Sequence, residues 1–376
     1  MTRRIRTFSL TLLVAAIAAL GTAAQAGAAT GMEVALQDDK VFVEQAYLKH
    51  QKGLDLIEQL NVSWLKVTVN WSNVTKSSAK SSSKPSTVKY DFSAYDAIVT
   101  SARARGINIE MALAGPAPRW ATGDRKKIGP FKPNATYFGD FVRETARHFT
   151  GLVTRYSIWN EPNHVGWIAP LKSQASVYAA LYKKGYAALR AVDPSAEILY
   201  GELAPYPSRK TTATAPLAFL RAATKAGGIK ADGFAHHPYD FDHAPNFKYP
   251  GKDNVTLSGL SKLTNALNTL ARSNKLSTED GKPLDVYLTE YGYFQTGKRK
   301  MPESRRAKYI PQAFEIAFKN KRVKQMLHFL LAKPTKKYLF FDTSIVSQTG
   351  AKTATFTALA KWASDKAGKG QIATAR

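Results

Sequence analysis

The chain has 376 residues with a formal net charge of +26, is 44% hydrophobic, and contains no cysteine. This apolar content excludes a globally disordered chain, and the length suits one large domain. Without cysteine the protein can form no disulfide, thiolate nucleophile or cysteine-bound metal site. The positive charge favours an anionic partner such as an acidic polysaccharide, a cell wall or a phospholipid surface, although a general adaptation of solubility explains it equally well.

The chain begins with the three parts of a secretory signal. Three arginines within the first six residues precede an apolar segment, Ser9–Leu20, that is too short to span a bilayer comfortably. The pattern Ala24-Gln25-Ala26 predicts cleavage after Ala26, so residues 1–26 are a signal peptide and residues 27–376 the secreted protein. An uncleaved anchor is the alternative. Export argues against nucleic acid as a partner, and no later stretch is long and apolar enough to cross a membrane.

Short apolar runs alternate with amphipathic segments along the rest of the chain. In Leu257–Ala271, leucines recur at spacings of three and four, which is one face of a helix, and Val177–Arg190 is a second such segment. Strand followed by helix, repeated eight times, predicts an α/β fold with a single catalytic domain, the (β/α)8 TIM barrel. The predicted strands are Met32–Gln37, Trp64–Asn70, Ile107–Ala114, Val153–Trp159, Ile198–Gly201, Gly233–His236, Asp285–Thr289 and Gln325–Leu331.

Three segments lack hydrophobic periodicity. Thr75–Lys89, rich in serine and lysine, predicts a mobile loop after the second strand, and Gly123–Pro133 predicts a basic loop after the third. The polar tail 365–376 is expected to fray. Basic residues gather in the loops after the third, seventh and eighth strands, which would give the open end of the barrel a cationic rim unless the whole surface is basic; they are Lys126, Lys127, Lys132, Lys298, Arg299, Lys300, Arg305, Arg306, Lys333, Lys336 and Lys337.

Two acidic residues stand directly beyond apolar runs. Glu161 follows the fourth predicted strand and Glu290 the seventh. Catalytic groups of a TIM barrel lie at the carboxyl ends of its strands, so both carboxylates should enter one bowl. Cleavage of a glycosidic bond needs such a pair, one carboxyl group to donate a proton and one to attack or stabilise the anomeric carbon. A salt bridge or a helix cap is the alternative for either residue taken alone.

The residues around Glu161 carry a resemblance to a known group of enzymes. Trp159-Asn160-Glu161-Pro162-Asn163 resembles the fourth-strand signature of clan-A glycoside hydrolases, which include the cellulase-like and xylosidase/iduronidase-like families. The resemblance implies that Glu161 is the acid/base, that Asn160 binds the sugar 2-hydroxyl, and that Trp167 lies in the sugar cleft.

Other segments are similar to the same clan in order and spacing, from about Gly31 to Trp362. Glu290 corresponds to its nucleophile, and His237-Pro238-Tyr239 to a segment whose tyrosine bonds that nucleophile. Pro118-Arg119-Trp120-Ala121 is similar to its Pro-x-Trp element, and the stretch from Phe341 to Lys352 to its closing segment. The resemblance implies double displacement with retention, with Glu290 attacking while Glu161 protonates the leaving oxygen, and carboxyl groups about 5–5.5 Å apart.

Two positions depart from the clan. Lys66 stands on the second strand where an arginine near the nucleophile is usual, and lysine lacks the bidentate fork of arginine. The eighth strand carries His328-Phe329 and no tryptophan beneath the sugar. We expect Lys66, Asn160, His237, Tyr239, Trp120 and Trp167 to contact the substrate; Trp120, Trp167 and Tyr293 are candidate sugar platforms, with loop packing as the alternative for each.

The histidines give no metal site. His236 and His237 are neighbours on a strand and so point to opposite faces, which makes them poor co-ligands, although His243, Asp240 and Asp242 lie close in sequence. We expect no metal, no cofactor and a monomer acting on a carbohydrate, which could be an anionic glycan or a cell-wall polymer. The alternatives are a catalytically silent barrel that binds glycan or cell wall, and a transglycosylase with the same catalytic residues.

Overall fold

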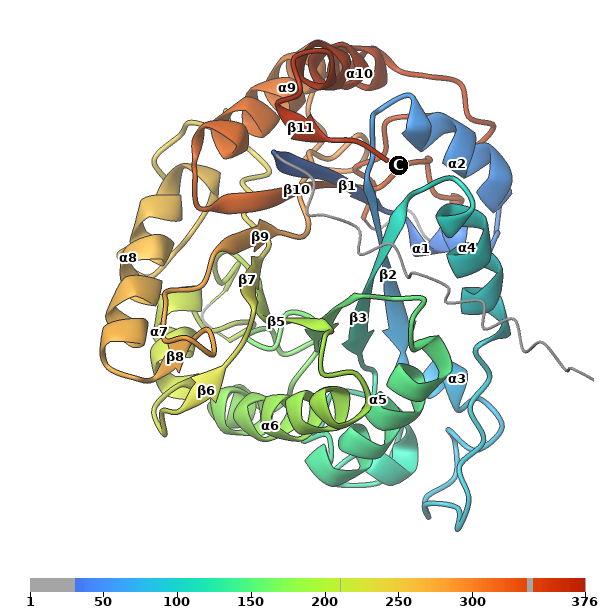
Figure 1. Cartoon of the computed structure of the whole chain (residues 1–376), viewed down its shortest axis with the longest axis vertical. Helices are drawn as coiled ribbons and strands as arrows, with labels where there is room; N and C mark the ends of the chain where they lie inside the picture. The colour runs from blue at the N-terminus through green and yellow to red at the C-terminus, as the bar shows by residue number, and fades with distance from the viewer. Residues whose placement is uncertain (1–30, 210, 337–340, 376) are drawn as a thin grey trace, which may run out of the picture.

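The computed structural model describes residues 31–209, 211–336 and 341–375, and the predicted signal peptide lies outside these ranges. Eight parallel strands stand around a common axis inside a ring of helices (Figure 1). The last barrel strand pairs with the first, with His328 opposite Leu36, which closes the sheet. The predicted TIM barrel is confirmed.

The barrel strands agree closely with the apolar runs of the sequence, and three have the predicted bounds. They are β1 (Met32–Gln37), β2 (Trp64–Asn70), β3 (Asn108–Ala114), β4 (Arg155–Ile158), β5 (Glu197–Leu203), β7 (Gly233–His236), β9 (Val286–Leu288) and β10 (Val323–Phe329). Two short strands outside the barrel, β6 (Ile229–Lys230) and β8 (Leu276–Ser277), pair with each other. The tail predicted to fray is partly ordered, because β11 (Ile372–Ala373) pairs with the start of β1.

The helices surround the outer face of the barrel (Figure 1), and they turn their apolar stripes toward it. Helix α8 shows the rule: the leucines whose spacing predicted it, at positions 260, 263, 267 and 270, are buried, and position 257 lies in a preceding 3-10 turn. The helices are α1 (Asp39–Phe42), α2 (His50–Glu58), α3 (Trp71–Val74), α4 (Ser93–Arg103), α5 (Ala135–Phe149), α6 (Gln174–Val192), α7 (Pro216–Ala223), α8 (Leu260–Arg272), α9 (Glu303–Lys319) and α10 (Ala354–Ala367).

The loop predicted over Thr75–Lys89 contains neither strand nor helix. Among the described residues, no helix is long and apolar enough to cross a membrane.

The interior of the barrel is charged at the amino ends of its strands. Arg155 lies between the rings of Trp64 and Tyr287, with its guanidinium carbon 3.6 and 4.6 Å from their centroids. It donates two hydrogen bonds to Glu33, at 2.7 and 3.0 Å, and one to Glu197 at 2.6 Å. We call these five residues the amino-end cluster. A buried arginine needs this fork of acceptors, because an unpaired charge in the interior is strongly unfavourable.

Candidate functional site

The two glutamates predicted from the sequence stand at the carboxyl ends of two strands. Glu161 lies three residues beyond the end of β4, and Glu290 two residues beyond the end of β9. The chain turns sharply before the first of them, since Trp159 and Glu161 have left-handed backbone angles of φ 71° and 36°. Such angles cost on the order of 1 kcal/mol or more for a residue with a side chain, and they are typical of functional sites.

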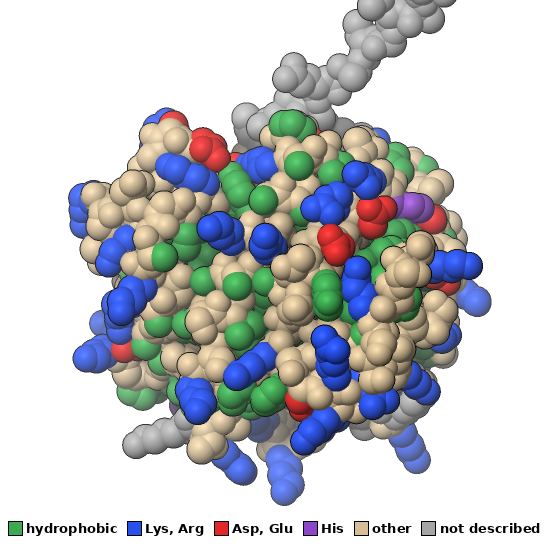
Figure 2. Space-filling model, turned by 90° about the horizontal axis from the view of Figure 1, so that it is seen from below, with side chains coloured by type: hydrophobic (Ala, Val, Ile, Leu, Met, Phe, Trp, Pro, Cys, Tyr) green, Lys and Arg blue, Asp and Glu red, His purple; other side chains and the backbone are tan. Residues whose placement is uncertain are grey.

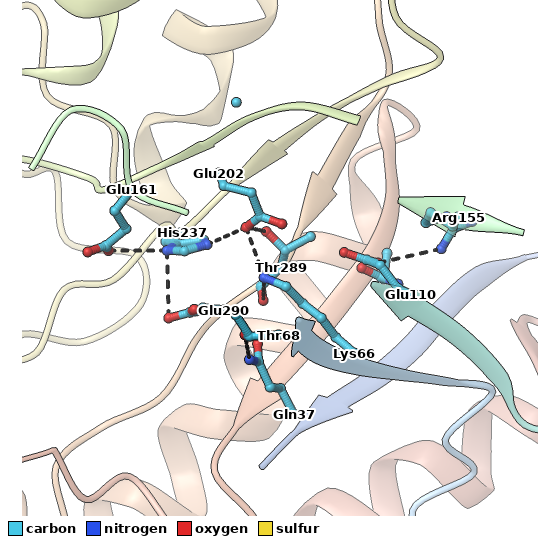
Figure 3. Close-up of polar contacts among 12 residues, drawn as sticks. Gln37, Lys66, Thr68, Glu110, Arg155, Glu161, Glu202, His237, Thr289 and Glu290 are labelled. Atoms are coloured by element: carbon cyan, nitrogen blue, oxygen red, sulfur yellow. Dashed lines mark hydrogen bonds and ion pairs between the residues drawn. The ribbon is translucent and has the colours of Figure 1, made fainter. Parts of the chain in front are cut away.

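One imidazole joins the two carboxylates (Figure 3). The Nδ1 atom of His237 lies 3.2 Å from Oε1 of Glu161 and 3.6 Å from Oε2 of Glu290. Tyr239 donates a hydrogen bond of 3.1 Å to the same oxygen of Glu290. The two glutamates are therefore brought together by the segment His237-Pro238-Tyr239, and the contact of Tyr239 with Glu290 is the one that the resemblance to the clan led us to expect.

These contacts limit how far apart the two carboxylates can be. Two oxygens at 3.2 and 3.6 Å from one nitrogen are separated by no more than about 7 Å, whereas retaining pairs have carboxyl groups about 5–5.5 Å apart and inverting pairs about 6.5–9.5 Å apart. This bound applies to the two oxygens nearest His237, and it is compatible with the separation of a retaining pair.

A third carboxylate, Glu202, lies beneath this pair and was missed by the sequence analysis. It stands near the end of β5 and is fully buried. Its Oε2 accepts hydrogen bonds from Lys66 at 2.9 Å and from Thr289 at 2.7 Å, and lies 2.5 Å from Nε2 of His237. With the two upper carboxylates, Glu161 and Glu290, these residues form what we call the carboxyl-end cluster.

Lys66 was expected to contact the substrate, and the structure corrects this. Its side chain is fully buried and does not line the cavity above the cluster. Its Nζ donates to Glu202 and, at 3.3 Å, to the carbonyl oxygen of Thr289. The lysine therefore supports the site from below.

Burial and mutual contacts shift the pKa of the ionisable residues in the cluster. Burial alone would lower the pKa of His237, but Glu290, Glu161 and Glu202 together raise it to about 10. Burial opposes ionisation of Glu202 as well, yet Lys66 and His237 hold its pKa far below the usual range. The imidazole is therefore a cation and Glu202 an anion at neutral pH.

The two upper carboxylates are shifted in opposite directions. Burial favours the neutral form of Glu161, but the hydrogen bond and charge of His237 outweigh it and lower its pKa. The pKa of Glu290 is raised, chiefly by burial, with the charges of His237 and Lys66 acting against the shift. In this state Glu161 is the more easily ionised of the two.

The carboxylate pair opens into a cavity of about 610 Å³ walled largely by aromatic and apolar side chains. Asn160, Tyr239 and Trp167, all predicted to contact the substrate, line it together with the two glutamates. Aromatic walls with a few convergent polar groups are the usual make-up of a small-molecule site. The remaining lining residues are Asp39, Lys40, Tyr47, His164, Gly166, Ala204, Pro205, Tyr206, Ser208, Phe241, Phe294, Arg299, Phe329, Leu330, Pro334 and Phe341.

Two predicted aromatic platforms pack in the interior instead. Trp120 is 1% exposed and meets Trp71 edge to face with ring centroids 5.7 Å apart, so loop packing is its role. Tyr293 is fully buried and donates to the carbonyl oxygen of His243 at 2.8 Å. Phe329, at the end of the eighth barrel strand, supplies an aromatic ring on the cavity wall where the clan usually has tryptophan.

The predicted cationic rim is only partly present. Arg299 lines the cavity, but it bonds Asp242 through Nε at 2.9 Å and Nη2 at 2.5 Å. Arg306 is fully buried and donates to Glu303 and to backbone carbonyls, so it is no part of a rim. On the face shown in Figure 2, lysine and arginine side chains are spread across the view rather than gathered in one patch.

The histidines expected to bind no metal are held by other contacts. His243 lies 2.9 Å from Asp240, and Nε2 of His236 lies 2.9 Å from the carbonyl oxygen of Val255. No group of three or more acidic or histidine side chains suited to a metal ion occurs within the described ranges.

Neither a protein-family model nor a curated protein matches the sequence. The fold is nevertheless similar to that of solved glycosidases. A family 39 glycoside hydrolase from Bacteroides cellulosilyticus WH2 aligns with a TM-score of 0.68 at 17% identity, over 89% of this chain and 64% of that one. This chain therefore spans slightly less than two thirds of that relative.

Two further structures align over most of this chain. Xylanase 10B from Thermotoga maritima gives a TM-score of 0.60 at 13% identity, over 90% of this chain and 97% of that one. A GH2 β-galacturonidase from Eisenbergiella tayi gives 0.54 at 11% identity, over 89% and 51%. At these identities the likeness establishes the fold, and the expected resemblance to clan-A glycoside hydrolases is confirmed as a shared eight-stranded parallel barrel.

Proposed function

We propose that this chain is a retaining glycoside hydrolase in which Glu290 is the nucleophile and Glu161 the acid/base. One observation carries the proposal: carboxylates from two distant strands meet at one imidazole nitrogen, at 3.2 and 3.6 Å, on the wall of an aromatic cavity. Two carboxylates that meet at one nitrogen, placed where a sugar ring can lie against aromatic side chains, are compatible with the arrangement that double displacement needs.

The reaction has two steps that use the same residues. In the first, a carboxylate oxygen of Glu290 bonds the anomeric carbon while the bond to the leaving oxygen breaks, and Glu161 gives its proton to that oxygen. In the second, Glu161 removes a proton from water, the water oxygen bonds the anomeric carbon, and Glu290 leaves as a carboxylate. Tyr239 fixes Glu290, and Asn160 and Trp167 contact the sugar.

The first step needs a proton on Glu161, whereas His237 favours its anion when the cavity is empty. The side chain of Glu161 is 22% exposed and that of Glu290 12% exposed, so a bound sugar removes more water from Glu161. Loss of water favours the neutral acid. Nδ1 of His237 also lies near Glu290. When the proton resides on Glu161, the positively charged imidazole therefore pairs with the ionised nucleophile.

The charges of the cavity favour a neutral sugar over the anionic one considered from the sequence. Three carboxylates line it, from Asp39, Glu161 and Glu290. Its two cations already bond acids, Lys40 with Glu44 at 2.5 Å and Arg299 with Asp242. A uronate would bring a further negative charge to a wall whose own cations already bond acids, so we propose a neutral sugar at the cleaved bond even though one relative of the fold binds galacturonate.

We also propose that the enzyme is exported, on the strength of the amino-terminal sequence alone. The terminus of protein recovered from the culture medium should begin at residue 27.

Chemical rescue tests the assignment of the two glutamates. The variants Glu161→Ala and Glu290→Ala are each incubated with an activated aryl glycoside and sodium azide. Azide should restore turnover in both, giving a glycosyl azide of retained configuration from the first variant and of inverted configuration from the second. The opposite products would exchange the roles. If the wild-type chain hydrolyses no neutral or uronate glycoside but still binds glycans, the silent binding barrel replaces this proposal.

A further inference from the structure

The two ring nitrogens of His237 differ in their partners: Nε2 has one carboxylate partner, and Nδ1 faces two (Figure 3). Nε2 lies 2.5 Å from Glu202, whose position is set by Lys66 and Thr289. Nδ1 faces both upper carboxylates, at 3.2 and 3.6 Å, with one proton to offer. A single N–H makes one good hydrogen bond, so we expect it to donate to whichever of the two carboxylates is charged.

The double displacement described above moves the negative charge between these two carboxylates. Before the first step Glu290 is ionised and Glu161 carries a proton. In the covalent intermediate Glu290 is a neutral ester, and Glu161 is ionised so that it can accept a proton from water. In both states one of the two is charged, and the N–H of His237 has one anion to face.

The cluster is electrically balanced in both states. Lys66 and the His237 imidazolium supply two positive charges, and Glu202 with one upper carboxylate supplies two negative charges. All of these side chains are buried to a large extent, where an uncompensated charge is strongly unfavourable. The balance is lost if the imidazole becomes neutral or if both upper carboxylates ionise.

We propose that His237 is a shared positioning residue that pairs with Glu290 in the first half of the reaction and with Glu161 in the second, and that Glu202 keeps it cationic throughout. Glu202 therefore acts on the reaction only through His237. The inference rests on the proposed function for its two half-reactions, but the charge state of His237 is a property of the protein alone.

The groups around His237 support this assignment from every side. Glu202 comes from β5, Lys66 from β2, Glu161 from beyond β4 and Glu290 from beyond β9, while Glu110 on β3 lies deeper in the barrel. Its neighbour in the chain, His236, has a pKa lowered by burial to about 4, so it adds no positive charge at neutral pH. The carboxylates of Glu290, Glu161 and Glu202 face the imidazole and raise the pKa of His237.

The first experiment follows the imidazole itself. The side-chain nitrogens of His237 are observed by ¹⁵N NMR in full-length protein between pH 6 and 9, with the signal assigned by its loss in His237→Gln. In the wild type both ring nitrogens should stay protonated across this range. In Glu202→Gln the ring should lose its charge within it. A wild-type ring that is neutral at pH 7, or a variant that titrates like the wild type, overturns the role of Glu202 whether or not the chain is an enzyme.

The second experiment separates the half-reactions. With a dinitrophenyl glycoside the second step limits kcat, whereas kcat/KM reports the first step. A shared role predicts that both quantities fall by about 10- to 1,000-fold in Glu202→Gln and in His237→Gln. A fall in only one of them would show that His237 serves a single carboxylate.

A matched control uses the other end of the barrel. Glu197 is a partly buried acid on the same strand as Glu202 that bonds Arg155. Glu197→Gln should leave both rate constants and the His237 spectrum unchanged, and thermal unfolding of each variant reports whether it is folded. If wild-type turnover is absent altogether, the proposed function fails while the NMR experiment still decides the charge of His237.

Discussion

The barrel holds two buried ionic clusters, one at each end, and they are built from the same kinds of residue. In the amino-end cluster, Arg155 is enclosed by two aromatic rings and bonds Glu33 and Glu197. In the carboxyl-end cluster, Lys66 and His237 bond Glu202. Glu110 lies between them, 3.9 Å from Arg155 and bonded by Gln325 at 3.1 Å.

The clusters differ in whether the buried cation has one fixed set of acceptors or alternative acceptors. The guanidinium of Arg155 has a fixed set of acceptors and packs between two aromatic rings, and none of its partners lines the cavity. At the other end, one N–H has two acceptors, both at the cavity wall. Fixed pairing stabilises a fold, whereas alternative pairing lets a charge move during a reaction. A buried charge alone therefore does not indicate a functional site. A buried charge with two alternative partners at a cavity wall is the better indication.

The largest difference should appear when one carboxylate is neutralised at each end. Glu290→Gln should lower kcat by at least about 10⁴-fold, since the nucleophile is lost while the shape is kept. Glu197→Gln should leave kcat within about twofold of wild type, because it bonds Arg155 far from the cavity. Steady-state kinetics on an aryl glycoside measures both. Equal losses would mean that the two ends are not separate in function.

Removing the cation at each end should cost a similar amount of stability but should affect activity at only one end. Arg155→Met leaves Glu33 and Glu197 without their partner, and breaking such a buried pair costs about 3–5 kcal/mol of unfolding free energy. The folded fraction should keep its kcat. Lys66→Met should cost a similar amount and also lower kcat, because Glu202 loses a partner. Urea unfolding with parallel kinetics tests the pair, and an Arg155 variant that is stable but inactive would contradict the comparison.

How far the sequence predicted this site depends on which residue is considered. Glu161 and Glu290 follow long apolar runs, so their position at strand ends was visible. Glu202 directly follows the predicted run Ile198–Gly201, and the strand itself continues to Leu203, two residues beyond the predicted end. The criterion that selected the other two glutamates therefore applies to Glu202 as well.

The orientation of Glu202 could not have been predicted. The pairing of β5 with β7 shifts register between Gly201 and Leu203, and Glu202 has a left-handed φ of 53°. A Cβ on Gly201 would lie 2.4 Å from the carbonyl oxygen of Ala235, so only glycine fits at this bulge. The sequence offered one sign of this bulge, which is a glycine directly before an acidic residue near the end of a strand.

The predictions that Trp120 is a sugar platform and that Arg306 belongs to a cationic rim were wrong for another reason. Their neighbours, Trp71 for the first and the carbonyls of Thr343 and Ser344 for the second, are distant in sequence. Residue type and loop position cannot show whether a side chain turns inward to meet such partners.

A smaller effect should appear in the pH dependence of stability. The pKa of His237 is about 10 in the folded protein, above the usual value of about 6.5, so its contribution is complete below pH 6.5 and is lost as pH rises toward 10. From pH 7 to 9.5 the unfolding free energy should therefore fall, by about 3 kcal/mol more in the wild type than in His237→Gln. Glu197→Gln should follow the wild type. Parallel curves for wild type and His237→Gln would place the cation elsewhere.

The smallest effect on activity concerns two tryptophans for which the sequence predicted the same role. Trp167 lines the cavity, so Trp167→Ala should raise KM about tenfold through lost stacking on the sugar, with little change in stability. Trp120 packs against Trp71 in the interior, so Trp120→Ala should leave KM unchanged and cost about 3–5 kcal/mol of unfolding free energy. Kinetics and urea unfolding of both variants separate contact with the substrate from packing. If Trp120→Ala alone raised KM, the cavity that binds sugar would extend beyond the residues that line it in this structure.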